Sequence, residues 1–154
     1  MKKPLLLIIL VLSFLFSSQV TSNAATKTLK AGQAVTLSYP STVTLKKSGC
    51  QNVSFKYSVG KMPKISFAYI AILDDADKQI GGDTFYETPE TGFGPREKIW
   101  KKNGSFNLKI CRSDWSRDIG DDEYEDMTGV SKGTYQLYLA VYPSTEAYAT
   151  ITFK

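Results

Sequence analysis

The hydrophobic pattern of this chain beyond residue 25 has the period of two residues that half-buried β-strands require. Two runs, Gln51–Val59 and Ser105–Cys111, alternate regularly between apolar and polar side chains. Their apolar positions are Val53, Phe55, Tyr57 and Val59 in the first run, and Phe106, Leu108 and Ile110 in the second. No stretch of this region shows the 3.6-residue period of an amphipathic helix. The pattern therefore predicts an all-β protein.

Further strand-like runs are separated by turn residues, which predicts an antiparallel β-sandwich of seven to eight strands, immunoglobulin-like or jelly-roll-like. These runs cover residues 34–39, 42–45, 65–73, 84–86, 98–101, 134–142 and 147–153. The run 65–73 is apolar at both odd and even positions, so we expect it at the centre of a sheet and covered on both faces. Asn103-Gly104 predicts a turn, with a hairpin between the runs on either side. The last two runs predict a closing hairpin.

The first 24 residues have the composition of a secretory signal peptide. Lys2 and Lys3 precede the apolar run Leu5–Phe16, and the small residues Ser22 and Ala24 fit the positions that signal peptidase recognises. The run is shorter than the roughly 20 apolar residues of a membrane-spanning helix. We expect cleavage after Ala24 and a soluble product of bacterial type, secreted to the cell exterior or the periplasm.

Removal of residues 1–24 leaves 17 Lys and Arg against 15 Asp and Glu. This excess of two positive charges is too small to indicate nucleic acid or an anionic membrane as the partner. Residues 25–154 are enough for one domain with a sizeable core. We therefore expect a single domain over this range, whose partner is a protein or a glycan at the cell exterior.

Cys50 and Cys111 are the two cysteines of the chain, and in an oxidising compartment two cysteines form one bridge. Each lies at the end of a strand-like run, at a position with outward parity. We therefore predict a disulfide that ties loops at one end of the sandwich, and not a bridge through the core between the sheets.

Segment 71–81 combines an apolar strand, an aspartate, a polar turn and a glycine. Segments 132–137 and 148–151 form a closing Gly-x-Tyr hairpin, and Tyr135 has the position of the tyrosine corner of immunoglobulin-like folds. These segments resemble secreted bacterial β-sandwich modules of the pre-peptidase C-terminal type. The resemblance implies a non-catalytic module of the kind usually attached to secreted enzymes.

The chain contains no histidine, which excludes Ser-His-Asp and Cys-His catalysis and zinc sites built on histidine. Bridged cysteines leave no thiolate, and no glycine-rich phosphate loop is present. Carboxylate chemistry remains, but a glycosidase needs two carboxylates facing each other across a sugar cleft, and the sequence shows no such pair. We expect no enzyme activity; a carboxylate-based hydrolase is the last alternative.

Seven acidic residues fall within the segment 112–131, which is predicted to be a long loop. They are Asp114, Asp118, Asp121, Asp122, Glu123, Glu125 and Asp126. The leading interpretation is a solvated acidic loop without a cofactor. The alternative is a calcium site, because calcium takes six to eight oxygen ligands, of which Asp118, Asp121, Asp122 and Asp126 would supply several.

The glycine- and proline-rich segment 82–98 is predicted to be the second long loop. Four aromatic residues in or beside the two loops are candidate ligand contacts: Tyr86, Phe93, Trp100 and Trp115. The leading functional hypothesis is a non-catalytic secreted binding or interaction module that presents loops 82–98 and 112–131. The alternative is a calcium-dependent carbohydrate-binding module that uses the same loops.

Melting curves recorded with calcium and with a chelator separate these two hypotheses. A ligand at 100 times its dissociation constant stabilises a domain by about 2.7 kcal/mol, which is several degrees in Tm. The solvated-loop interpretation predicts no shift in Tm. A saturable rise would instead identify the acidic segment as a metal site.

Overall fold

The computed structural model describes residues 25–60, 67–86, 98–99, 102–120, 122–142 and 145–154. This part of the chain consists of β-strands joined by turns, and none of it is helical. The strands are β1 Thr26–Ala31, β2 Val35–Pro40, β3 Thr42–Val43, β4 Cys50–Val59, β5 Phe67–Leu73, β6 Gln79–Tyr86, β7 Lys98–Ile99, β8 Asn103–Cys111, β9 Trp115–Gly120, β10 Glu123–Met127, β11 Gly133–Tyr142 and β12 Thr145–Phe153.

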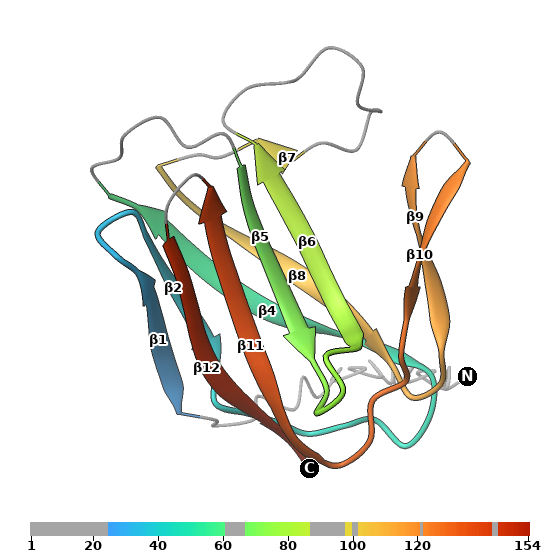
Figure 1. The fold of residues 1–154 in the computed structure, drawn as a ribbon. Helices are drawn as coiled ribbons and strands as arrows, with labels where there is room; N and C mark the ends of the chain where they lie inside the picture. Colours follow the sequence, from blue (N-terminus) through green and yellow to red (C-terminus); the bar gives the residue numbers. More distant parts are fainter. Residues whose placement is uncertain (1–24, 61–66, 87–97, 100–101, 121, 143–144) are drawn as a thin grey trace, which may run out of the picture.

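Two sheets form a sandwich, and a separate two-stranded hairpin stands beside them (Figure 1). One sheet has the order β1-β2-β4-β8 and the other β3-β12-β11-β5-β6-β7. The segments β2-β4-β8 and β12-β11-β5-β6 correspond to the A-B-E and G-F-C-C′ strands of an immunoglobulin-like sandwich. The predicted fold class is confirmed, and of the two predicted types the strand order is the immunoglobulin-like one.

The core lies between the sheets and is built from their inward-facing side chains. Phe106 of β8 stacks on Phe55 of β4 with ring centroids 5.2 Å apart. The Phe106 ring also meets Phe85 of the opposite sheet edge-on, at 4.8 Å. Burying one such side chain stabilises the fold by about 1.5–3 kcal/mol, and an aromatic pair adds about 0.5–1.5 kcal/mol. This cluster therefore holds the two layers together at one end of the sandwich.

Tyr135 at the start of β11 makes the bonds of a tyrosine corner. Its hydroxyl donates to the Ser131 carbonyl oxygen at 3.1 Å and accepts from the Ser131 backbone N–H at 3.0 Å. The tyrosine corner predicted from Gly133-x-Tyr135 is thus confirmed. The same region begins the closing hairpin of β11 and β12, which is also confirmed.

The central position predicted for the run 65–73 is confirmed, because β5 pairs with β11 on one side and with β6 on the other. Its inner side chains Ala68, Ile70 and Ile72 have no exposed surface. Its outer face carries Phe67 and Tyr69, which are half-buried. Neighbouring side chains of the same sheet cover this outer face in part, as described below.

The predicted loop 82–98 is wrong for Gly82 and Asp83, which belong to β6, whereas the short strand expected at 84–86 is confirmed as the end of β6. Lys98 belongs to β7, within the run expected at 98–101, and residues 87–97 lie outside the described part. Gly81 and Gly82 are strand residues and not turn residues. A Cβ on Gly81 would lie 2.9 Å from the Lys109 carbonyl oxygen of β8. Glycine is present here because the edges of the two sheets approach closely, which a local turn signal does not reveal.

The turn predicted at Asn103-Gly104 is also wrong, because both residues are in β8 and pair with β4. Gly104 faces Tyr57 in the register, and a Cβ on Gly104 would lie 2.5 Å from the ring of Tyr57. The glycine leaves room for this aromatic ring. The preceding strand β7 runs parallel to β6 in the other sheet and forms no hairpin with β8.

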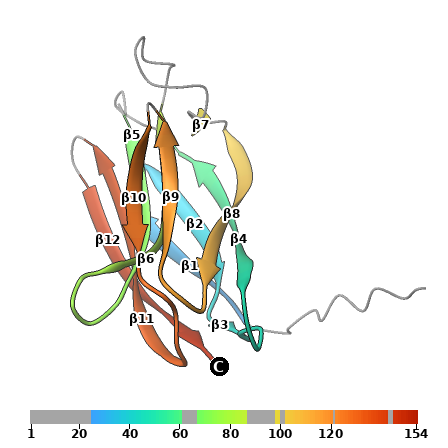
Figure 2. The same ribbon diagram turned by 90° about the vertical axis from the view of Figure 1, so that its right-hand side faces the viewer.

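The acidic segment 112–131 is not one long loop, because it contains the antiparallel pair β9 and β10. This hairpin stands at one side of the sandwich, beside β6 and β8 (Figure 2). Strand β1, at the edge of the four-stranded sheet, was not predicted either. These three strands are among those that raise the number above the expected seven to eight.

Cys50 and Cys111 form the predicted disulfide. They are the first residue of β4 and the last residue of β8, and they face each other in the register of these neighbouring strands. The bridge is at the end of one sheet and does not cross the core, as predicted, although it ties strand ends and not loops. It closes a loop with a sequence separation of 61 residues.

We expect reduction of this disulfide to lower the free energy of unfolding by up to about 4 kcal/mol, because the unfolded chain regains the entropy of a loop of this length. Urea unfolding with and without reductant measures the difference. The double variant Cys50→Ala/Cys111→Ala should match the reduced protein and be insensitive to reductant. Equal midpoints for the oxidised and reduced protein would show that the bridge does not constrain the unfolded chain.

Candidate functional site

The outer face of the six-stranded sheet carries a group of aromatic side chains, which we call the aromatic face. In β11 the odd-numbered residues Leu137, Leu139 and Val141 are buried, so the even-numbered ones point away from the core. The same reasoning applies to β5 and β12 through their register with β11. The aromatic face consists of Phe67, Tyr69, Tyr138, Tyr142 and Tyr148.

The rings of the aromatic face contact one another across the strands. Phe67 and Tyr142 are stacked with centroids 5.2 Å apart and an angle of 5° between their planes. Tyr138 lies 5.1 Å from Tyr148 and 6.2 Å from Tyr69. Tyr142 and Tyr148 are nevertheless 55% exposed, so these contacts leave a large part of both rings open to solvent.

Glu146 joins two hydroxyl groups of this face. Its Oε1 accepts a hydrogen bond from the Tyr138 hydroxyl at 3.0 Å, and its Oε2 accepts one from the Tyr148 hydroxyl at 2.9 Å. Burial and then the Glu146 bond raise the pKa of Tyr138 to about 12. The bond to Glu146 is the largest cause that raises the pKa of Tyr148. Both hydroxyls therefore keep their protons at neutral pH and donate hydrogen bonds to Glu146.

Tyr69 lies at the border of the aromatic face toward β6. Its hydroxyl donates to Gln79 Oε1, and desolvation by burial, followed by the charge of Glu125, raises its pKa to about 12. A Cβ on Gly82 would lie 2.1 Å from Gln79 Nε2. The absence of a side chain at this position therefore allows Gln79 to reach across β6 to Tyr69.

The outer face of the four-stranded sheet is different in chemistry. Apart from the bridged Cys50 and Cys111, its outward positions on β4 and β8 hold Ser, Asn and Lys residues, among them the exposed Asn52, Lys56 and Lys109. Ser54 donates to Asn107 Oδ1 at 2.6 Å on this face. A sandwich of this kind thus folds with an ordinary polar outer face, so the fold itself does not require aromatic residues on the other one.

Arg117, in the middle of β9, fixes the β9–β10 hairpin to the sandwich. The Arg117 guanidinium donates to the Gly82 carbonyl oxygen and, at 2.5 Å, to Glu125, and it lies 3.8 Å from Asp83. On the other side, Lys109 Nζ lies 4.5 Å from the ring centroid of Trp115, a cation–π distance. The hairpin therefore bridges the edges of both sheets.

The predicted calcium ligands are distributed along this hairpin. Asp118 is in β9, Asp122 is in the turn with φ of 61°, and Asp126 is in β10, where it accepts a 2.9 Å bond from Ser116. Asp121 lies outside the described residues. Among the residues that the structure describes, no three acidic, cysteine or histidine side chains are grouped closely enough to hold a metal ion.

The four predicted ligand-contact aromatics do not form a described group. Trp115 is half-buried beneath Lys109, and its indole N–H is buried without a hydrogen-bond partner. Tyr86 ends β6, while Phe93 and Trp100 lie outside the described residues. Sequence reasoning missed the aromatic face because it treated its members as strand residues only. The available signal was the occurrence of Tyr138, Tyr142 and Tyr148 at outward positions, where polar residues are expected.

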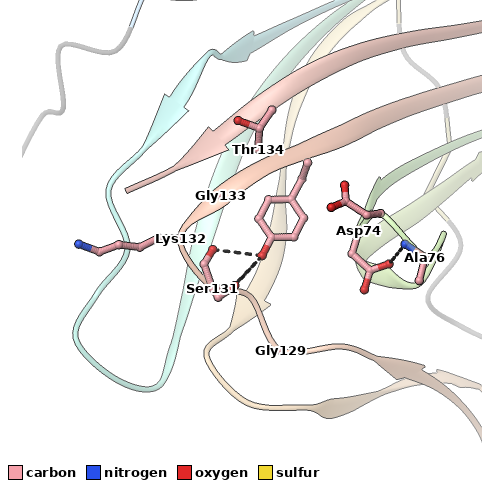
Figure 3. A pocket seen from close by; sticks show the side chains of 9 residues that line it. Asp74, Ala76, Gly129, Ser131, Lys132, Gly133 and Thr134 are labelled. Atoms are coloured by element: carbon pink, nitrogen blue, oxygen red, sulfur yellow. Dashed lines mark hydrogen bonds between the residues drawn. The ribbon is translucent and has the colours of Figure 1, made fainter.

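An open hollow of about 400 Å³ lies between the β5–β6 turn and the segment before β11 (Figure 3). Asp74 and Ser131 line it from opposite sides. Asp74 Oδ1 already accepts the backbone N–H groups of Ala76 and Lys78, at 2.9 and 2.8 Å. The Tyr135 hydroxyl is likewise bonded to Ser131. These polar groups serve the turn and the tyrosine corner.

The described residues include no helix with the length and apolar character needed to cross a membrane. Comparison of the whole chain with protein-family models finds no match, and neither does comparison with curated proteins.

We expect an alkaline titration at 295 nm to detect tyrosines with a pKa near 12, because Tyr69 and Tyr138 are raised to that value from 10.0. Above pH 10 the folded protein then binds more protons than the unfolded chain, so its stability should decrease as the pH rises toward 12. In Glu146→Gln the pKa of Tyr148 and Tyr138 should decrease, whereas that of Tyr69 should not. Identical titration curves for the wild type and this variant would contradict the Glu146 bonds.

Proposed function

We propose that this protein is a non-catalytic secreted binding module, and that the aromatic face is its binding surface. The proposal keeps the function expected from the sequence but moves the surface from loops 82–98 and 112–131 to a sheet. A surface on strands is held in place by the hydrogen bonds of its ladders, which keeps the rings in a fixed arrangement before a ligand binds.

The observation that carries the proposal is the exposure of Tyr142 and Tyr148, at 55% each, beside three further aromatic rings. Cross-strand aromatic pairs stabilise a sheet by about 0.2–1 kcal/mol each, so they have some structural value by themselves. That value does not explain why one outer face is aromatic and the other polar. Tyrosines concentrated on one solvent-facing surface are typical of recognition sites, because each offers a large rigid ring and a hydroxyl at low entropic cost.

Four further features support a non-catalytic secreted module. The N-terminal segment has the pattern of a signal peptide, and the Cys50–Cys111 disulfide suits an oxidising compartment. The resemblance of segments 71–81 and 132–137 to pre-peptidase C-terminal modules points to the same non-catalytic role. The sequence contains no histidine, which excludes the kinds of catalysis that depend on it.

The test is the binding of the full chain to an array that displays both glycans and peptides. We expect the variant Tyr142→Ala/Tyr148→Ala to lose at least tenfold in affinity for any ligand found, because a stacking aromatic at a binding site contributes more than 1 kcal/mol. The matched control is Asn52→Ala/Lys56→Ala on the opposite outer face, which should bind like the wild type. Because all four side chains are exposed, both variants should melt within a few degrees of the wild type.

Two results would refute the proposal. One is a wild-type protein that binds nothing on the array. The other is a ligand whose affinity is the same in the aromatic-face variant and in the control variant, since binding would then take place elsewhere on the molecule.

A further inference from the structure

We infer that the ligand of the aromatic face is an uncharged glycan chain. This inference rests on the proposed function and adds the chemical class of the ligand. It follows from three properties of the face: its charge, its hydrogen-bonding groups and the spacing of its rings.

The charge of the face excludes polyanions. The outward positions of β5, β11 and β12 hold aromatic residues, alanines, threonines, Leu73, Gln136 and Glu146, and none of them is Lys or Arg. Among the described residues, the further charges that act on these tyrosines are Asp77 on Tyr148, and Glu125 and its ion-pair partner Arg117 on Tyr69. On these outward positions, sulfated or uronate-rich glycans, nucleic acids and anionic lipids would meet the Glu146 carboxylate and no Lys or Arg.

The hydrogen-bonding groups around Glu146 need a partner that donates. The Tyr138 and Tyr148 hydroxyl protons are both directed to Glu146. Each hydroxyl oxygen and each carboxylate oxygen retains lone pairs that can accept further bonds. Sugar hydroxyls are suitable donors, and a sugar ring also presents an apolar C–H surface to the neighbouring aromatic rings.

A cationic ligand would also donate hydrogen bonds, but the face offers it little charge. Glu146 is the one acidic residue on the outward positions of the described strands β5, β11 and β12, and both of its oxygens already accept a bond. A polycation gains affinity from several carboxylates, which the acidic β9–β10 hairpin has and this face lacks. An uncharged ligand suits the face better.

The rings are spaced for an extended ligand. Tyr138 and Tyr142 are four residues apart on β11, which corresponds to about 14 Å along the strand. Tyr138 forms one ring group with Tyr148 of β12, and Tyr142 forms a second with Phe67 of β5. A single sugar would contact one of these groups, whereas a chain of several sugars would contact both. We therefore expect affinity to increase with the length of the oligosaccharide.

Native gel electrophoresis of the full chain tests this inference. The gels contain a neutral polysaccharide (hydroxyethyl cellulose, galactomannan, laminarin or dextran) or an anionic one (alginate or heparin). We expect at least one neutral polysaccharide to retard the wild type, and no retardation by the anionic ones. Polylysine in the gel tests whether a basic polypeptide binds instead. Sedimentation at a series of protein concentrations tests whether a second copy of the chain binds.

The variants identify the groups that bind. We expect Tyr148→Ala to weaken retardation by tenfold or more, and Glu146→Gln and Tyr148→Phe by about five- to tenfold each, because one net hydrogen bond is lost. Asn52→Ala/Lys56→Ala should stay within twofold of the wild type. Because Glu146→Gln and Tyr148→Phe conserve side-chain shape, a loss of binding in these variants is not a loss of folding.

Failure of the inference and failure of the proposed function give different results. The first possible result is that the protein binds alginate, heparin, polylysine or a second copy of itself, and that Tyr142→Ala/Tyr148→Ala abolishes this binding. Such a result would overturn the glycan class and leave the binding face intact. Absence of retardation by every neutral polysaccharide would also overturn the glycan class. Glycan binding that all aromatic-face variants retain would overturn both.

Discussion

The mutual burial of the inner faces of the two sheets is the constraint on which the rest of this structure depends. Phe106 of one sheet meets Phe85 of the other, and the surrounding side chains have almost no exposed surface. Because side chains alternate between the two faces of a strand, a slip of one residue would move every apolar residue of that strand to the solvent. The core therefore fixes the register, and the register places Tyr138 and Tyr142 on the outside.

The two outer faces of the sandwich differ because the core does not constrain which residues lie at outward positions. Hydrophobic burial sets no requirement on outward positions, and on β4 and β8 these hold Ser, Asn and Lys residues besides the bridged cysteines. The six-stranded sheet fills them with rings that contact each other and with Glu146, which links two tyrosine hydroxyls. The β9–β10 hairpin closes the side of the sandwich through Arg117, and the disulfide fixes one end of β4 and β8. The ring contacts and the two bonds to Glu146 are what hold the aromatic face in one arrangement.

Local patterns in the sequence determined most of the strands of the two sheets and their inward and outward positions. The alternation in Gln51–Val59 and Ser105–Cys111 predicted both strands correctly, and the double-sided apolar run 65–73 predicted the centre of a sheet. The parity of Cys50 and Cys111 correctly excluded a bridge through the core. These predictions succeeded because side-chain alternation is a property of the strand itself, which every strand shows whatever its neighbours are.

Tertiary structure decided the features that depend on segments far apart in the chain. Gly81 and Gly104 have the local signature of turns, yet they lie in strands, because a facing strand or ring occupies the space of their missing side chains. The acidic segment forms a hairpin because Arg117 finds acceptors in β6. The aromatic face exists because β5, β11 and β12 are neighbours. Strand order is set by long-range packing, and no local pattern specifies it.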